Sequence, residues 1–167
     1  MDIQRLSGNA GNAGNAGSRL RHIRLRALAD TPDAFGAVYA EAAARPMDTW
    51  AQQLDDIATF VAVHDGEDVG LVRCAGDEQR RDTAWLISMW VAPEARGLGV
   101  GNALVNAVIE HARASGAARL VLDVADENRH AIALYASQGF EPNGVTGSLP
   151  APRQHIREHQ RELRLSR

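Results

Sequence analysis

The chain has 167 residues, of which 45% are hydrophobic and 23% charged, and its formal net charge is -3 at pH 7. This composition excludes a disordered or collagen-like chain and predicts a single globular domain over residues 1–167. The one cysteine, Cys74, has no partner for an internal disulfide, so we expect a reducing, cytoplasmic setting. All 18 basic residues are arginine, which excludes Schiff-base lysine chemistry and phosphate-binding loops that end in Gly-Lys-Ser/Thr.

Neither the charge balance nor the hydropathy pattern points to a nucleic acid or a membrane. The slightly acidic balance argues against a nucleic-acid partner. No stretch approaches the ~18 apolar residues of a membrane span, and the N-terminus lacks the basic and then apolar order of a signal peptide. We therefore expect neither kind of partner.

The first third of the chain predicts one strand and two helices. Residues 2–6 fit a short strand, and residues 8–17, which include three Gly-Asn-Ala repeats, are expected to form a mobile loop because they lack large apolar groups. One helix is expected from an N-cap at Ser18 to the stop before Pro32. A second should begin at Pro46 and place Trp50 in the core. Residues 35–45 fit either a helix or a loop near a substrate.

The charged side chains in this region have two interpretations. Four arginines of the first helix are expected on a solvated face, unless one of them binds a phosphate or a carboxylate. Four acids are expected either to face solvent or to form an acidic rim that attracts a cationic amine. The arginines are Arg19, Arg21, Arg24 and Arg26, and the acids are Glu41, Asp55, Asp56 and Asp82.

The rest of the chain alternates strands and helices. Residues 60–64 and 69–74 flank a short polar turn and predict a hairpin. The elements expected after it are a buried central strand at 83–91, a helix from Val100 to Ser115, a strand at 119–124, a helix at 131–138 that ends at Gly139, and a final strand at 156–165. This order predicts an α/β fold of three layers, with helices on both faces of a mixed sheet.

A glycine-rich segment between the central strand and the next helix is the strongest functional signal. Three glycines alternate in Arg96-Gly97-Leu98-Gly99-Val100-Gly101. They let the backbone approach a ligand and leave the first helical amides free, which suits a pyrophosphate. The alternative is a turn that only permits tight packing. The spacing does not fit the dinucleotide fingerprint G-x-G-x-x-G.

A second segment, Asn128 to Phe140, opens the last helix. Asn128 and Tyr135 are seven residues apart and so lie on nearly the same helix face. Taken alone, Asn128 is the N-cap and Tyr135 a half-buried packing residue.

Together the two segments resemble the GCN5-related N-acetyltransferases. The glycine segment is similar to that family's acetyl-CoA pyrophosphate motif, Q/R-x-x-G-x-G/A. The second segment, Asn128-x-x-Ala131-x-x-Leu134-Tyr135-x-x-x-Gly139-Phe140, matches the motif that follows it. The resemblance covers residues 55–165 and implies a mostly antiparallel sheet of the acyl-CoA acyltransferase fold, with acetyl-CoA as cosubstrate and no metal.

The resemblance also implies roles for individual residues in cofactor binding. The backbone of Trp90, Val91 and Ala92 would pair with the pantetheine arm, which Asn128 would also bind. The pyrophosphate would be held by the amides of Arg96, Gly97, Leu98, Gly99, Val100 and Gly101.

For the reaction, the resemblance implies a general acid and a general base. Tyr135, protonated at neutral pH, would donate a proton to the departing thiolate, and a backbone amide near Val91 would stabilise the oxyanion. Many relatives carry a glutamate base near position 85, where this chain has Trp85. For the base, the resemblance then implies Asp123, which matches a glutamate of the ribosomal-protein N-terminal acetyltransferase branch, or an ordered water. Ser88 and His130 are further candidates.

These observations predict an N-acetyltransferase that acts on a primary amine of a small molecule, peptide or protein. The alternative is a noncatalytic acyl-CoA-binding module that has lost its base. His155 and His159 could share a metal if they lay on a helix, but no third ligand is evident. The oligomeric state is left open between a monomer and a homodimer.

Overall fold

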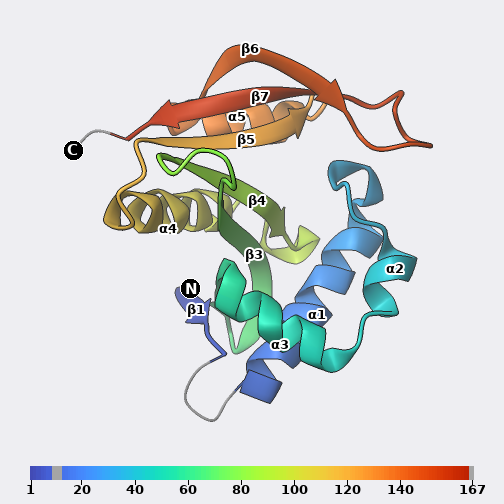
Figure 1. Cartoon of the computed structure of the whole chain (residues 1–167). Helices are drawn as coiled ribbons and strands as arrows, with labels where there is room; N and C mark the ends of the chain where they lie inside the picture. The colour runs from blue at the N-terminus through green and yellow to red at the C-terminus, as the bar shows by residue number, and fades with distance from the viewer. Residues whose placement is uncertain (9–12, 166–167) are drawn as a thin grey trace.

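The computed structural model describes residues 1–8 and 13–165. In chain order the elements are β1 (Asp2–Leu6), α1 (Ala13–Asp30), η1 (Pro32–Ala34), α2 (Tyr39–Ala43), α3 (Met47–Asp56), β2 (Ala58–His64), β3 (Glu67–Gly76), β4 (Thr83–Val91), η2 (Pro93–Ala95), α4 (Val100–Ala114), β5 (Arg119–Ala125), α5 (Arg129–Ser137), β6 (Glu141–Ser148) and β7 (Arg157–Arg164). Figure 1 shows their arrangement. The expected order of strands and helices is confirmed.

The strands form one mixed sheet between two layers of helices. Its order is β1-β2-β3-β4-β5-β7-β6. The β4–β5 pair is parallel and the other neighbouring pairs are antiparallel. Helices α1, α2 and α3 lie on one face, and α4 and α5 lie on the other (Figure 1). The predicted fold class, a three-layer and mostly antiparallel sheet, is confirmed.

Strand β4 separates from β5 halfway along its length. The two strands pair only through Thr83, Ala84 and Trp85. Farther along β4 the register with β3 shifts by one residue, and Ser88 in this stretch has a positive φ of 59°. An extra residue of this kind bends a strand and increases its twist. The carboxyl half of β4 therefore turns away from β5 and leaves a gap in the middle of the sheet.

The hydrophobic core lies on both sides of β2, β3 and β4. Leu20 and Ile23 of α1 and Trp50 of α3 are fully buried on one side, and Leu104 of α4 is fully buried on the other. The helical spacing of the apolar residues in α1 and the core position of Trp50 are confirmed. Cys74 of β3 is buried as well.

The expected loop at 8–17 is wrong for its last residues, because α1 begins at Ala13 and not after a cap at Ser18. Residues 9–12 lie outside the described chain. A Cβ added at Gly17 would lie 3.1 Å from the backbone nitrogen of Ala51, so the lack of a side chain at Gly17 lets α1 approach α3. This glycine serves helix packing, whereas composition alone indicated a flexible tract.

Two further expectations for the N-terminal region are refined. Pro46 is the N-cap of α3 and not its first residue. Residues 35–45 were expected to form either a helix or a loop, and they contain both, because loop segments flank the short helix α2.

Within the described residues, no helix has both the length and the apolar character needed to cross a membrane.

Candidate active site

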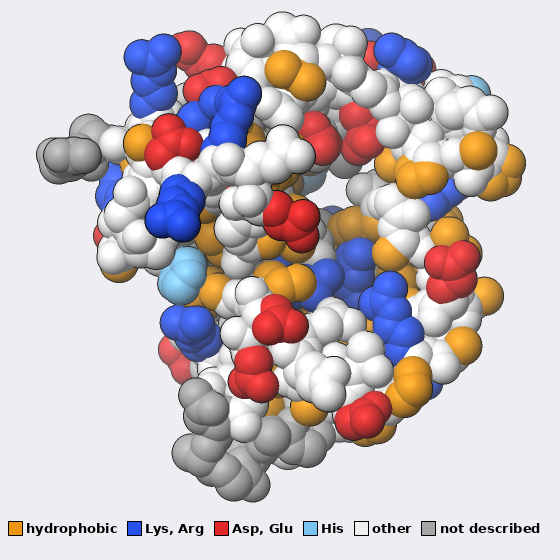
Figure 2. Space-filling view, in the orientation of Figure 1, with side chains coloured by type: hydrophobic (Ala, Val, Ile, Leu, Met, Phe, Trp, Pro, Cys, Tyr) orange, Lys and Arg blue, Asp and Glu red, His pale blue; other side chains and the backbone are white. Residues whose placement is uncertain are grey.

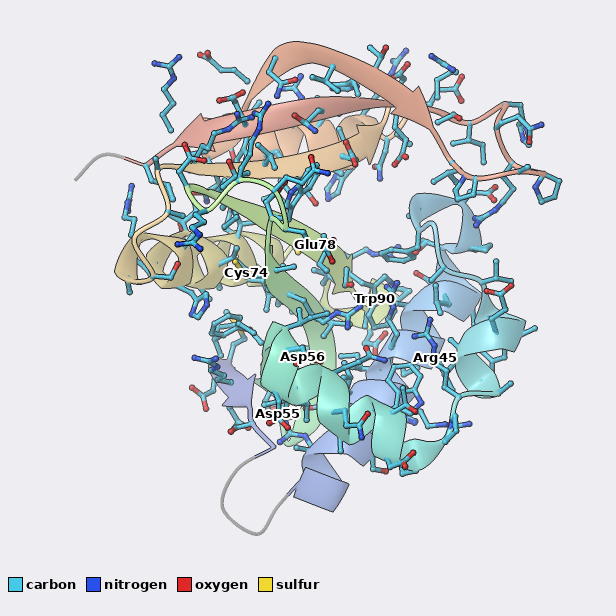
Figure 3. All side chains as sticks on the ribbon, in the orientation of Figure 1. Arg45, Asp55, Asp56, Cys74, Glu78 and Trp90 are labelled. Carbon is cyan, nitrogen blue, oxygen red and sulfur yellow. The ribbon has the colours of Figure 1, made fainter. Side chains whose placement is uncertain are left out.

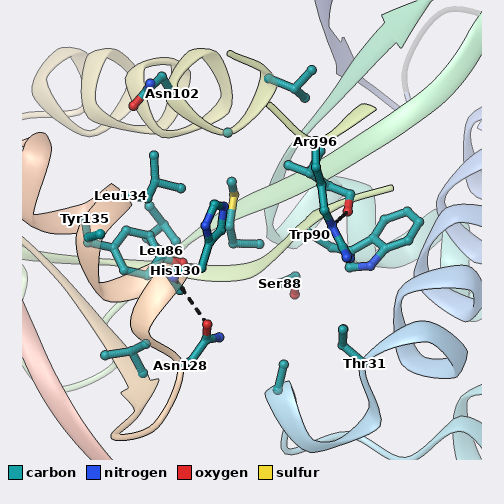
Figure 4. Close-up of a pocket in the computed structure, with 18 of the residues that line it drawn as sticks. Thr31, Leu86, Ser88, Trp90, Arg96, Asn102, Asn128, His130, Leu134 and Tyr135 are labelled. Carbon is teal, nitrogen blue, oxygen red and sulfur yellow. Dashed lines mark hydrogen bonds between the residues drawn. The ribbon is translucent and has the colours of Figure 1, made fainter. Parts of the chain in front are cut away.

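A cavity of about 770 Å³ occupies the gap between β4 and β5. Its walls come from the segment after α1, the carboxyl half of β4, the first turn of α4, the end of β5 and the helix α5 (Figure 4). Most of the predicted site residues line it: Trp90, Val91, Arg96, Gly97, Gly99, Val100, Gly101, Asp123, Asn128 and Tyr135. Ala92 and Leu98 do not, and the Leu98 side chain is exposed.

The three glycines around the start of α4 differ in conformation and surroundings. Gly97 and Gly99 have φ values of 79° and 82°, a left-handed conformation that costs glycine little. The backbone N–H groups of residues 97–102 have no acceptor within the described chain, and no side chain caps the helix. A Cβ at Gly101, by contrast, would lie 3.1 Å from Leu134 Cδ2. The packing interpretation is therefore confirmed at Gly101, whereas the ligand interpretation of Gly97 and Gly99 stays a prediction.

The open edge of β4 presents Val91 and not Ala92. The N–H of Ala92 donates to Val69 O at 2.8 Å, and its carbonyl accepts from Ala95 N at 2.9 Å. Because polar groups alternate along an antiparallel strand, those of Val91 point away from β3 and toward the gap. The expectation that Ala92 pairs with a ligand is therefore wrong, since both of its backbone groups already have partners.

An ion pair and two hydrogen bonds hold the rim of the cavity beside Val91. Arg96 Nη2 lies 2.7 Å from Asp30 Oδ2, and Arg96 Nε donates to Val91 O at 3.0 Å. Trp90 Nε1 donates to the same Asp30 oxygen at 3.0 Å. The hydrogen bond from Trp90, followed by the contact with Arg96, lowers the pKa of Asp30. Arg96 thus connects the end of α1 to the end of β4.

Asn128 and Tyr135 lie on the α5 side of the cavity (Figure 4). Asn128 Oδ1 accepts from Ala131 N at 3.2 Å, so the N-cap interpretation is confirmed. The Tyr135 ring is buried and packs edge-on against Phe140 with 5.8 Å between ring centroids. Burial raises the pKa of Tyr135 far above its ordinary value, which keeps the phenol protonated near neutral pH.

Asp123 stands on β5 opposite Gln160 of β7. Partial burial raises the pKa of Asp123, and a hydrogen bond with Gln160 opposes the shift. Burial, Asp123 and Asp126 together raise the pKa of the neighbouring Glu158. Within the described chain, Asp123 is the only carboxylate that lines the cavity.

The other candidate groups occupy varied positions. Trp85 does not line the cavity, and its Nε1 donates to Asp77 Oδ2 at 2.9 Å. Ser88 and His130 do line it. His159 lies on the strand β7, where its Nδ1 is 2.8 Å from Asp126 Oδ1, so the helical spacing with His155 does not arise. The described residues contain no group of three or more possible metal ligands.

The acidic rim considered for the cavity does not form there. Glu41, Asp55, Asp56 and Asp82 are exposed, and none of them lines the cavity. The expectation of a solvated face is wrong for one arginine of α1, because Arg24 is only 6% exposed.

Sequence reasoning missed two arginines near the cavity, Arg73 and Arg153, and named Arg24 only as one of four arginines on a helix. A signal existed for Arg73, which is a lone charge inside the apolar run of β3 and is 7% exposed. For Arg153 there was none, since it lies in the loop before β7 and donates to the carbonyls of Pro32, Phe35 and Gly36. Contacts across such a sequence separation leave no local pattern.

Comparison with known proteins agrees with this geometry. Residues 25–140 match the model of the acetyltransferase (GNAT) family. An uncharacterised N-acetyltransferase of Methanocaldococcus jannaschii is 35% identical over 100 residues, or 58% of this chain and 44% of that protein. A mycothiol acetyltransferase of Thermomonospora curvata is 29% identical over 130 residues, or 78% of this chain and 42% of that protein. A solved acetyltransferase structure from Salmonella typhimurium, with its cofactor acetyl-CoA, has a TM-score of 0.71 at 18% identity and covers 100% of this chain and 96% of that one.

The chain spans less than half the length of these two curated relatives. The family match nevertheless extends over more than half of the chain and includes the glycine turn and the segment around Tyr135. The structural likeness, at its low identity, adds agreement of the fold. The chain therefore belongs to the GNAT acetyltransferase family.

Proposed function

We propose that this chain is an acetyl-CoA-dependent N-acetyltransferase that transfers the acetyl group directly to a primary amine of a small molecule, peptide or protein. The observation that carries the proposal is the gap between β4 and β5. It joins the free amides of residues 97–102 to the buried phenol of Tyr135 in one cavity.

The residues around the cavity fit a bound acetyl-CoA. The free amides and the positive end of α4 suit the pyrophosphate. The backbone N–H of Val91 faces the gap and suits an extended pantetheine arm, while its carbonyl accepts from Arg96 Nε. Asn128 uses its Oδ1 as a cap and keeps its amide Nδ2 for donation to the same arm. The bound thioester supplies the activated acetyl group.

Tyr135 and Asp123 can each carry out one of the two proton transfers that the reaction needs. The phenol remains protonated because it is buried, so it can donate its proton to the departing sulfur. The Asp123 carboxylate, directly or through an ordered water, would accept the proton that the amine loses. A backbone N–H near Val91 would stabilise negative charge on the acyl oxygen.

The test is thiol release from acetyl-CoA in the presence of a panel of primary amines. We expect amine-dependent release, and we expect Tyr135→Phe to lower kcat by about a hundredfold while the affinity for acetyl-CoA is kept. Tyr39→Phe is the matched control, because Tyr39 is exposed on α2 and lies outside the cavity.

Three results would contradict the proposal in distinguishable ways. An unchanged kcat in Tyr135→Phe would remove the role of this residue as the acid. Binding of acetyl-CoA without turnover across the panel would favour a noncatalytic acyl-CoA-binding module. Calorimetry that showed no binding at all would leave the glycines with a packing role only.

A further inference from the structure

Three arginines gather behind one wall of the cavity without any carboxylate partner among the described residues. Arg24 of α1 and Arg73 of β3 are buried, with 6% and 7% of their surface exposed, whereas Arg45, just before α3, is exposed. Figure 2 shows arginine side chains in the central hollow of this face, and Figure 3 labels Arg45 beside it. None of the three forms an ion pair within the described chain.

The two buried guanidinium groups lie directly behind residues that line the cavity. The Arg24 guanidinium stands 4.6 Å from the centre of the Phe35 ring. Arg73 donates through Nε to Ser88 Oγ at 2.9 Å. Phe35 and Ser88 both line the cavity, and Ser88 lies on the side away from Asn102 and α4 (Figure 4). Arg24 and Arg73 do not themselves line the cavity, so an anion that entered between Phe35 and Ser88 would lie in the field of both positive charges.

This region has too few acceptors for its donors. Arg73 Nη1 reaches only the neutral Gln53 Oε1, at 2.9 Å. Arg24 Nη1 and Trp50 Nε1 are buried and have no acceptor within the described chain, and Arg45 lies over the Trp50 ring at 5.6 Å. Such groups are unfavourable in a folded chain unless something supplies the missing acceptors.

Electrostatics agree with this geometry. Burial first, and then the charges of Arg73 and Arg45, lower the pKa of Arg24 to about 9. Burial and Arg45 lower the pKa of Arg73 to about 10. In both residues the neighbouring charges that act are positive. A carboxylate or a phosphate would neutralise them, and guanidinium groups bind these anions with paired hydrogen bonds.

The opposite wall carries negative charge. Asp123 lines the cavity from β5, and Glu158 of β7 is close enough for the Asp123 charge to act on it. An acceptor with an amine at one end and an anionic group at the other would match both walls.

Resting on the proposed function, we propose that the acceptor amine carries a carboxylate or a phosphate, which binds at Arg24 and Arg73 while the amine faces Asp123. Arg24 and Arg73 are then the residues that select the acceptor.

The first experiment compares matched amines in acetyl transfer. Alanine is paired with alaninamide, and 2-aminoethyl phosphate with ethanolamine, so the two arms separate carboxylate from phosphate. We expect kcat/KM to favour an anionic member by about a hundredfold, and Arg24→Met to reduce that preference at least about tenfold. Arg21→Met, on the same helix, should keep the preference. Equal rates for charged and neutral members would overturn the proposal.

The second experiment does not depend on turnover. Thermal unfolding is followed with N-acetylalanine, N-acetyl-2-aminoethyl phosphate and N-acetylalaninamide. Ligands that bind the folded state raise Tm, so an anionic probe should protect the wild type more than the amide, and this difference should vanish in Arg24→Met and in Arg73→Gln. An equal rise in Tm with all three probes, or no rise with any of them, would overturn the anion site.

The unliganded variants add a check on folding. Replacing an unpaired buried charge with an apolar side chain of similar size is neutral or stabilising, so Arg24→Met should unfold at the same Tm or higher. A rise in Tm with the anionic probes, without any acetyl transfer, would support the anion site and contradict the proposed function. Acetyl transfer without a preference for anionic amines would support the proposed function and contradict the anion site.

Discussion

Two residues with raised pKa values face the same cavity, and their different surroundings suit the opposite roles proposed for them. Tyr135 is fully enclosed, and burial raises its pKa far enough to keep the phenol protonated. Asp123 is exposed on its strand and is only partly shielded by its neighbours. Burial raises the pKa of its carboxyl, so Asp123 holds its proton to a higher pH than a free aspartate does. A lasting proton donor and a proton acceptor are what direct acetyl transfer requires.

Asp123→Asn tests the acceptor role through the pH dependence of the rate. If Asp123 is the base, the wild-type rate falls as pH drops through the raised pKa of this carboxyl. The variant should lose this acidic limb and about a hundredfold in kcat. The measurement is a pH-rate profile at saturating acetyl-CoA, with Asp56→Asn as the control, since Asp56 is exposed at the end of α3, away from the cavity. A profile like the wild type's at a near-normal rate would remove Asp123 as the base and leave an ordered water, Ser88 or His130 as the acceptor.

The same substitution has a separate consequence for stability. Because the folded chain holds the Asp123 proton to a higher pH than the unfolded chain, folding binds protons between the two pKa values. Stability from this group is therefore lost as pH rises through that window. Asp123→Asn should unfold at an equal or higher temperature than the wild type above the window, and the difference should disappear below it.

At the scale of elements, the position of α4 depends on a glycine in β3. A Cβ at Gly70 would lie 2.9 Å from Leu104 Cδ1, 3.1 Å from Val100 Cγ1 and 3.3 Å from Trp90 O. Gly70 is opposite Val91 in the sheet, so it lies beneath both the first turn of α4 and the open end of β4. The close approach that it allows holds the free amides beside the cavity.

Gly70→Ala should therefore weaken both folding and cofactor binding. We expect a loss of about 1–3 kcal/mol in the free energy of unfolding, the usual cost of overpacking a core, and a lower affinity for acetyl-CoA because the first turn of α4 is displaced. Gly76→Ala in the same strand is the matched control, since its Cβ would meet nothing within 4 Å. Denaturant titration and calorimetry measure the two effects. Equal stability of the two variants would contradict this packing argument.

At the scale of the whole molecule, local patterns predicted the scaffold and the cofactor side of the cavity. The apolar spacing of α1, the central strand β4 and the glycine turn are signals that lie within short segments. Ala92 was misassigned because the sequence does not show which backbone groups β3 already occupies. The bulge at Ser88, which opens the gap, has no signature in a run of apolar residues.

The acceptor side could not be predicted because its contacts join distant segments. Arg24 looked like one arginine among four on a helix, yet the fold buries it against Phe35 and near Arg73. The Arg96–Asp30 ion pair likewise connects the end of α1 to the turn before α4, two segments that share no sequence pattern. Such pairs become visible only when the strands and helices are placed in space.

The hydrogen bonds of Arg153 also join segments that are distant in the sequence, and they lie beside the part of the cavity proposed to bind the acceptor amine. Arg153, in the loop between β6 and β7, donates to Pro32 O at 2.6 Å and to Phe35 O and Gly36 O at 3.0 Å. In Figure 1 this loop extends toward the segment that follows α1. Because Phe35 lines the cavity and covers Arg24, the three hydrogen bonds hold part of the acceptor wall in place.

Arg153→Met should release this segment without disturbing the cofactor side. We expect KM for the amine to rise roughly three- to tenfold, as the loss of one or two net hydrogen bonds implies, while Kd for acetyl-CoA stays the same. Hydrogen exchange of residues 31–38 should become faster in the variant. Arg157→Met is the control, because Arg157 is exposed on β7 and its side chain does not line the cavity. A change in acetyl-CoA affinity with unchanged exchange at 31–38 would show that Arg153 acts on the other side of the gap.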